Sequence, residues 1–185
     1  MHYQVGLFRA YKKEFSSDEV TILRDCFDSG ELTDEAKKVI DKVNHLVFEF
    51  NRLHLKFNLY ENKRPEIWAF DGEEGTNQKT KQADHSIHPG NIDRENVTKV
   101  TAILNVSSRD DVQGSELLFK NWPLPVRVDN FGDLQTDGTG ETQPTWINEQ
   151  GTLIVFPSLE PYGFQHTTSG PAKRLKFLYK GERFK

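Results

Sequence analysis

Residues 151–158 read Gly151-Thr152-Leu153-Ile154-Val155-Phe156-Pro157-Ser158. β-Branched and aromatic residues dominate this run, and turn-forming residues bound it, which is typical of a buried strand. A second run, from Lys173 to Tyr179, alternates basic with apolar residues. We therefore predict strands at Gly151–Phe156 and Lys173–Tyr179.

Short segments of the same character lie upstream, after Pro65. In them, β-branched and aromatic residues are separated by clusters of Gly, Pro, Asn and Asp, which predicts strands joined by turns. The candidate strands are Ile67–Phe70, Val97–Val106 and Glu116–Phe119. The polar segment Asp129–Gln143 has little that could be buried, so we expect a mobile loop there.

The first third of the chain has helical spacing instead. Ser16 and Glu19 have the spacing of a capping box, and Gly30 ends this segment. Thr33 is placed to cap a second helix, whose apolar residues fall mostly on one stripe that continues to Phe57. Helices followed by strands predict an α+β fold, in which helices pack outside a sheet sandwich.

Composition narrows the class of protein. A net charge of −4 argues against a protein that coats nucleic acid. Cys26 is the only cysteine, so no intrachain disulfide can form, which fits a reducing compartment. The start of the chain has no signal-peptide pattern, and no apolar run approaches the roughly 20 residues of a membrane helix. We expect a soluble, cytoplasmic protein with no membrane or nucleic-acid partner.

Three patches and a basic strand follow one another in an informative order. The patches are Asp84–Gly90, Gln113–Phe119 and Gly151–Ser158, and His166 and Lys173–Lys180 come after them. With Thr98-Lys99-Val100-Thr101 and Leu104-Asn105 between the first two, this order resembles the prolyl-hydroxylase-like branch of the iron(II)/2-oxoglutarate oxygenases. The resemblance covers roughly Trp68 to the C-terminus.

The resemblance implies a fold and a set of cofactors. The fold is a double-stranded β-helix, or jelly roll, over residues 66–185, supported by helices over residues 15–60 in a single domain of residues 1–185. The cofactors are Fe(II), 2-oxoglutarate and O2. In such sites two imidazoles and a carboxylate hold the iron on one face. A cation holds the far carboxylate of 2-oxoglutarate.

The first metal motif departs from the family pattern. His88 matches the first iron-binding histidine, but Gly90 stands where the family has aspartate. A glycine here resembles the radical halogenases, in which a halide such as chloride fills the vacant position. Other interpretations are that Asp93 or Asp84 replaces the ligand, or that the site is inactive.

The second metal histidine has two candidates. Counting from the Phe-Pro-Ser motif places Tyr162 at this position, and His166 comes four residues later. Imidazole is the better ligand for iron(II), so the resemblance favours His166 with a shifted loop. Simple packing is the other role that Tyr162 could have.

The last strand offers the cation. By the two-residue period of a strand, Lys173 shares a face with Leu175, Phe177 and Tyr179, and Arg174 lies on the other face. We predict that the mostly apolar face with Lys173 points inward, so that Lys173 binds the far carboxylate of 2-oxoglutarate. Arg174 is the second choice, and an exposed basic strand end is the alternative to both.

Three functions remain open from the sequence. The first is a hydroxylase-like oxygenase that acts on a small molecule or a protein side chain. The second is a halide-dependent halogenase, for which His88-Pro89-Gly90 is the support. The third is an inactive jelly roll that serves as a binding or structural module, since fold does not fix function. The sequence indicates neither the primary substrate nor an oligomeric state.

Overall fold

The architecture is seen in a computed structural model, which describes residues 2–5, 8–60, 65–72, 97–108, 110, 112–114, 117–119, 148–160, 162–164, 167–170 and 172–182. The described strands form one six-stranded antiparallel sheet and two antiparallel pairs. In spatial order the main sheet contains β1 (His2–Val5), β2 (Phe8–Tyr11), β7 (Leu153–Pro157), β4 (Val97–Asn105), β10 (Ala172–Gly181) and β3 (Glu66–Gly72). The pairs are β5 (Gln113–Gly114) with β9 (Thr167–Ser169), and β6 (Leu117–Phe119) with β8 (Tyr162–Phe164).

Two helices begin where the capping patterns predict them. Helix α1 (Ser17–Ser29) has Ser16 as its N-cap, with a complete capping box to Glu19. It ends at Gly30, which adopts the left-handed conformation that glycine tolerates best. Helix α2 (Asp34–Phe50) starts at Thr33, whose hydroxyl accepts a hydrogen bond from the backbone of Ala36.

The second helix is shorter than its apolar stripe predicts. Helix α2 ends at Phe50, and a π-helical turn, η1 (Asn51–Leu55), follows it. The side chain of Asn51 donates to the carbonyl of Phe57 at 2.9 Å and accepts from its N–H at 3.0 Å. Lys56, with a φ of 57°, adopts the left-handed conformation that ends the helical segment, so the prediction of a continuous helix to Phe57 was wrong.

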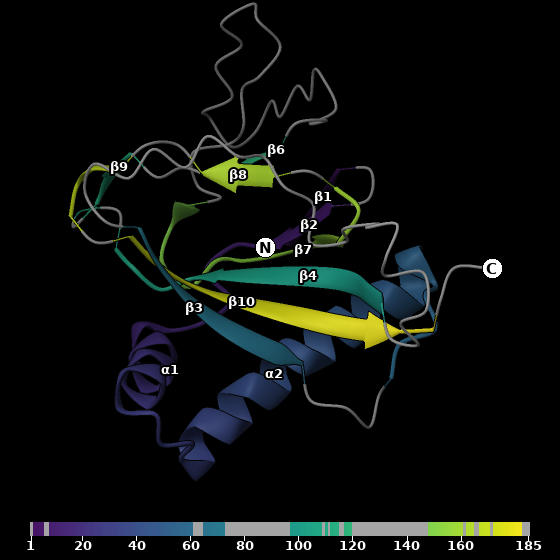
Figure 1. Ribbon diagram of the computed structural model, residues 1–185, viewed down its shortest axis with the longest axis horizontal. Helices are drawn as coiled ribbons and strands as arrows, with labels where there is room; N and C mark the ends of the chain where they lie inside the picture. Colours follow the sequence, from purple (N-terminus) through teal and green to yellow (C-terminus); the bar gives the residue numbers. More distant parts are fainter. Residues whose placement is uncertain are drawn as a thin grey trace, which may run out of the picture.

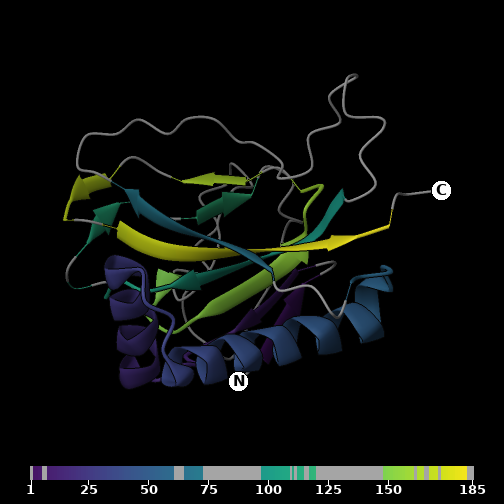
Figure 2. The same ribbon diagram turned by 60° about the horizontal axis from the view of Figure 1, so that its bottom comes forward.

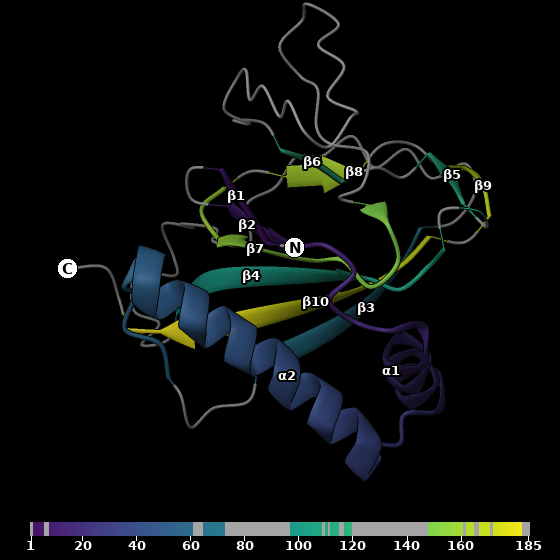
Figure 3. The same cartoon turned by 180° about the vertical axis from the view of Figure 1, so that it is seen from behind.

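The main sheet separates two layers of the molecule. Helices α1 and α2 cover one side of it, and the short strands β6 and β8 lie on the other side (Figure 1). Figure 2 shows α2 running along the helix-covered side of the sheet. Figure 3 shows the same layers from behind, with β5 and β9 near one end.

Each layer has its own apolar core. The helix-side core joins α1 and α2 to the main sheet, and the inner core joins the sheet to β6 and β8. The inner core draws its residues from the five strands β2, β4, β6, β7 and β8. They are Phe8, Ala10, Ile103, Leu117, Ile154, Phe156 and Tyr162, with Phe164 packed against them.

The α+β class with N-terminal helices is confirmed, and each of the five predicted strands corresponds to a strand of the structure. The hairpin of β1 and β2 was not predicted. The segment Asp129–Gln143 lies outside the described residues, and the jelly roll remains a prediction. Among the described residues, no helix is long and apolar enough to cross a membrane.

Candidate functional site

Strand β10 has two chemically different faces, and the structure determines which layer each face meets. Leu175, Phe177 and Tyr179 belong to the helix-side core. Because side chains alternate along a strand, Arg174 and Lys176 lie on the opposite face, toward β6 and β8. This result reverses the sequence prediction, which placed the apolar face on the inside.

Arg174 is the buried cation of the inner face. Arg174 is 6% exposed, and it lies directly opposite Asn105 of β4 in the sheet. The guanidinium donates from Nε to Asn105 Oδ1 at 3.1 Å, and its carbon lies 4.5 Å from the ring centre of Phe164. A guanidinium is a chemical group suited to binding a carboxylate through charge-assisted hydrogen bonds, and here it is held between a strand amide and an aromatic ring.

Lys176 and Tyr162 lie next to this group. The ammonium of Lys176 is 6.0 Å from the ring centre of Tyr162. Tyr162 itself is 7% exposed and packs edge-on against Phe156 and Phe164, with ring centres 5.2 Å and 5.9 Å away. Its packing role is therefore seen directly, while its role as a metal ligand remains a prediction.

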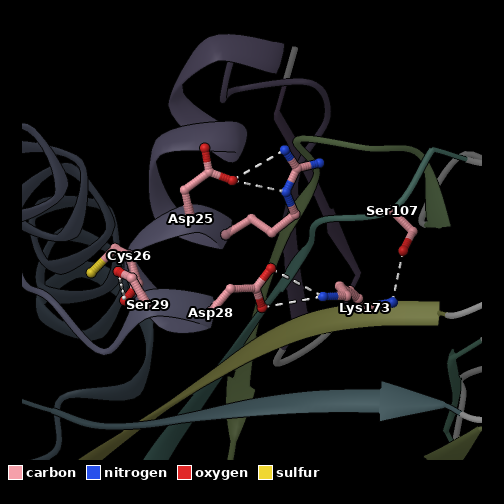
Figure 4. Close-up of polar contacts among 7 residues, drawn as sticks. Asp25, Cys26, Asp28, Ser29, Ser107 and Lys173 are labelled. Atoms are coloured by element: carbon pink, nitrogen blue, oxygen red, sulfur yellow. Dashed lines mark hydrogen bonds and ion pairs between the residues drawn. The ribbon is translucent and has the colours of Figure 1, made fainter.

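Lys173 lies on the helix side of the sheet. Its ammonium is 3.2 Å from each carboxylate oxygen of Asp28, near the end of α1 (Figure 4). Its backbone N–H donates to the hydroxyl of Ser107 at 2.7 Å. Since the neighbouring Arg174 points into the inner core, the geometry favours Arg174 over Lys173 for an inner anion.

A second buried cation lies at the other end of β4. Lys99 is 3% exposed, and its ammonium is 5.9 Å from the ring centre of Phe57. Burial lowers the pKa of Lys99, and the carboxylate of Glu182 partly opposes this shift. The inner face near Arg174 is therefore one of two places where the sheet buries positive charge among the described residues.

The remaining predicted site residues cannot be located in the same way. His88, Gly90, Asp84, Asp93 and His166 lie outside the described residues. In the part of the chain that is described, no group of three or more His, Cys, Asp or Glu side chains is placed to hold a metal ion. The proposed iron ligands therefore remain predictions.

The inner face fits one end of 2-oxoglutarate. The far carboxylate of that molecule needs a buried cation with geometry fixed by neighbours, and Arg174 has both properties. Phe164 and Phe156 would exclude water around such an anion and strengthen its attraction to the guanidinium.

Sequence reasoning overlooked two members of this group. Asn105 was named in a strand motif but was given no role at the site, and Lys176 was given no role either. A period of two along β10 does place Lys176 on the face of Arg174, which was an available signal. The bond between Asn105 and Arg174 joins residues 69 positions apart in the chain, and no local pattern reports it.

Solved structures share this fold. The viral collagen prolyl hydroxylase vCPH of Paramecium bursaria Chlorella virus-1, solved as a 2-oxoglutarate complex, has a TM-score of 0.62 over 96% of this chain and 97% of its own, at 12% identity. The chain thus has the fold of a prolyl hydroxylase. A prolyl-4-hydroxylase from Pseudomonas putida also has a TM-score of 0.62, over 97% of this chain and 90% of its own, at 15% identity.

A third similar structure is HygX from Streptomyces hygroscopicus, solved with nickel, 2-oxoglutarate and hygromycin B. Its TM-score is 0.58 over 97% of this chain and 84% of its own, at 15% identity. No protein-family model matches the chain, and no curated protein matches its sequence. The resemblance to prolyl hydroxylases inferred from the motifs is therefore confirmed by structure, at the level of the fold.

Proposed function

We propose that the chain is an iron(II)/2-oxoglutarate-dependent oxygenase of the hydroxylase kind, with a jelly-roll core. The main support is the buried guanidinium of Arg174 on the inner face of the sheet. Proteins with the same fold have been solved with 2-oxoglutarate. Its substrate would be a small molecule or a protein side chain.

The chain's residues would divide the work as follows. Arg174 binds the far carboxylate of 2-oxoglutarate, and Lys176 adds positive potential beside it. His88 and His166 hold the iron, with Tyr162 as the alternative to His166. The bound iron supplies the oxidising chemistry with O2, and the protein positions the reactants.

Binding of 2-oxoglutarate tests the role of Arg174. The metal-stripped protein is titrated anaerobically with iron(II) and 2-oxoglutarate, and the visible charge-transfer band of the iron–keto-acid chelate is followed. We expect Arg174→Met to weaken 2-oxoglutarate binding by about 10- to 100-fold, since a charge-assisted bond is lost. Lys173→Met is the matched control on the same strand, and its affinity should equal that of the wild type.

The same titration tests the metal ligands. We expect His88→Ala and His166→Ala to lose the band, whereas Tyr162→Phe should keep it. A folded wild-type protein that gives no band would overturn the proposal and favour an inactive binding module. A reaction that requires chloride would identify a halogenase instead.

A further inference from the structure

A pocket lies on the helix side of the sheet, where the end of α1, the helix α2 and the start of β3 meet (Figure 1). Its volume is about 410 Å³, which is within the range of small-molecule sites. Its apolar walls are formed by Cys26, Phe27, Leu32, Ile40, Pro65 and Ile67. Several of these residues belong to the helix-side core or pack against it, so the main sheet separates this pocket from the inner face.

The pocket is open space beside the core and not a packed part of it. Gly30 lines it, and a Cβ built on Gly30 would meet nothing within 4 Å. Leu32 lies in its wall with 41% of the residue exposed. An apolar group that bound here would remove the leucine side chain from water, which is favourable.

The charges around the pocket leave one carboxylate unmatched. The ammonium of Lys37, which lines the pocket, is 2.7 Å from a carboxylate oxygen of Asp34. Figure 4 shows the carboxylate of Asp28, at the end of α1, turned toward Lys173. Asp41 also lines the pocket, and within the described part of the chain no hydrogen bond or ion pair engages its carboxylate. The pocket therefore favours a positively charged ligand.

The polar groups of the pocket are gathered on one wall. Lys37, Asp41 and Asn44 all come from α2, and their spacing of four and three residues places them on one face of the helix. Asn44 is held in place, because its side-chain oxygen accepts a 2.8 Å hydrogen bond from the hydroxyl of Tyr179. The remaining walls, mainly from α1 and β3, are apolar. A ligand that matches this arrangement has an apolar body and a polar group at one end.

We propose that this pocket binds a small amphipathic amine, with an apolar body against Leu32 and Ile67 and an ammonium group beside Asp41. An acid of the same size would meet the carboxylate of Asp41 as a like charge, and a neutral ligand would gain nothing from it. The site does not depend on the proposed oxygenase function, since it uses neither the inner face nor the predicted iron ligands.

Three indoles of similar size test the preference for a cation. Tryptamine is positively charged, tryptophol has a hydroxyl in place of the amine, and indole-3-acetate is negatively charged. Each is titrated into the isotope-labelled full chain, and the backbone amide signals are followed by NMR, which reports both affinity and location. We expect tryptamine to bind about threefold to fivefold more tightly than tryptophol, and indole-3-acetate to bind more weakly than both. The signals that shift should include those of Gly30, Leu32 and Asn44.

Three variants separate the charge from the apolar contact. Asp41→Asn should abolish the preference, so that tryptamine and tryptophol bind within about 1.5-fold of each other. Glu35→Gln is the matched control, because it removes the same charge from α2 at a position that does not line the pocket, and it should keep the preference. Leu32→Ser should weaken all three ligands by about threefold and leave their ratios unchanged.

Each result supports the pocket or overturns it. Tryptamine at about 5 mM that shifts no signal of the pocket residues overturns the proposal, because a ligand of this size should bind in roughly the millimolar range or more tightly. A preference for tryptamine that survives Asp41→Asn overturns the role of that carboxylate. Shifts confined to residues outside the pocket overturn the location. None of these outcomes affects the proposed function, which is tested by 2-oxoglutarate binding.

Discussion

Gly151 occupies a place in the turn before β7 that no other residue can fill without strain. Its φ is +76°, and a Cβ built on it would lie 2.1 Å from the carbonyl oxygen of Phe15. Its own carbonyl accepts a hydrogen bond from the N–H of Phe15 at 3.1 Å. The close approach therefore belongs to a backbone contact that joins the start of α1 to the main sheet.

A pair of glycine variants separates conformational strain from collision. Gly30 has almost the same φ, +75°, but a Cβ there would meet nothing within 4 Å. We expect Gly30→Ala to lower the free energy of unfolding by about 1 kcal/mol, and Gly151→Ala by about 3 kcal/mol, because only the second adds a clash. Urea unfolding measures both. Equal costs would contradict the close contact.

At the scale of single residues, the sequence identified the basic side chains of β10 but not which layer of the molecule each one faces. The alternation of Lys173, Arg174 and Lys176 along one strand was read correctly, and it divides them between two faces. Which face is inner depends on where α1 and α2 pack, and both faces of this sheet are largely apolar. The pattern in β10 alone therefore could not distinguish the face that meets the helices from the face that meets Phe164.

At the scale of elements, one carboxylate connects the two helices. Glu19 accepts from the N–H of Ser16 at 2.8 Å within α1, and from the ammonium of Lys42 in α2 at 3.0 Å. Burial alone would raise the pKa of Glu19, but the bonds from Ser16 and Lys42 outweigh it and lower the pKa. The carboxylate is therefore more easily ionised in the folded protein than in the unfolded chain.

This shift predicts how stability depends on pH. A lowered pKa stabilises the fold above the unfolded value of about 4.3, and the effect is lost as the pH falls below it. We expect Glu19→Gln to be less stable than the wild type by about 0.5 kcal/mol at pH 7, with the gap closing toward pH 3. Thermal unfolding across this range measures it. Asp18→Asn is the control, because Asp18 lies in the same turn but outside this set of bonds, and its stability should differ less from that of the wild type at pH 7. If Glu19→Gln remained less stable than the wild type at pH 3, the carboxylate of Glu19 would not be the cause.

The elements themselves differ in how far the sequence could predict them. Both helix starts were predicted, because Ser16 and Thr33 act on neighbouring backbone groups. The end of α2 was missed, since the bonds between Asn51 and Phe57 depend on a turn that the apolar stripe does not report. Strand β2 was missed because it is short and pairs with β7, far away in the chain.

At the scale of the whole molecule, the main sheet separates the helix-side core from the candidate site on the inner face. The helix-side core contains Phe177, which is fully buried, and the inner core adjoins Arg174. The two residues lie on the same strand but on opposite faces. A change at Phe177 should therefore alter stability without altering ligand binding, whereas a change at Arg174 should alter ligand binding.

Ligand-linked stability tests this separation in one measurement. With nickel(II) and 2-oxoglutarate at 100 times its dissociation constant, the wild type should gain about 2.7 kcal/mol of stability, because only the folded state binds. Without ligand, Phe177→Leu should be about 1 kcal/mol less stable than the wild type. With ligand at 100 times this variant's own dissociation constant, it should gain the same stability as the wild type. Arg174→Met should also start lower, because it removes the donor to the buried side-chain oxygen of Asn105, and it should gain far less at the wild-type ligand concentration. If Phe177→Leu bound the ligand as poorly as Arg174→Met, the two faces would be coupled through the sheet, and the inner face would not be an independent site.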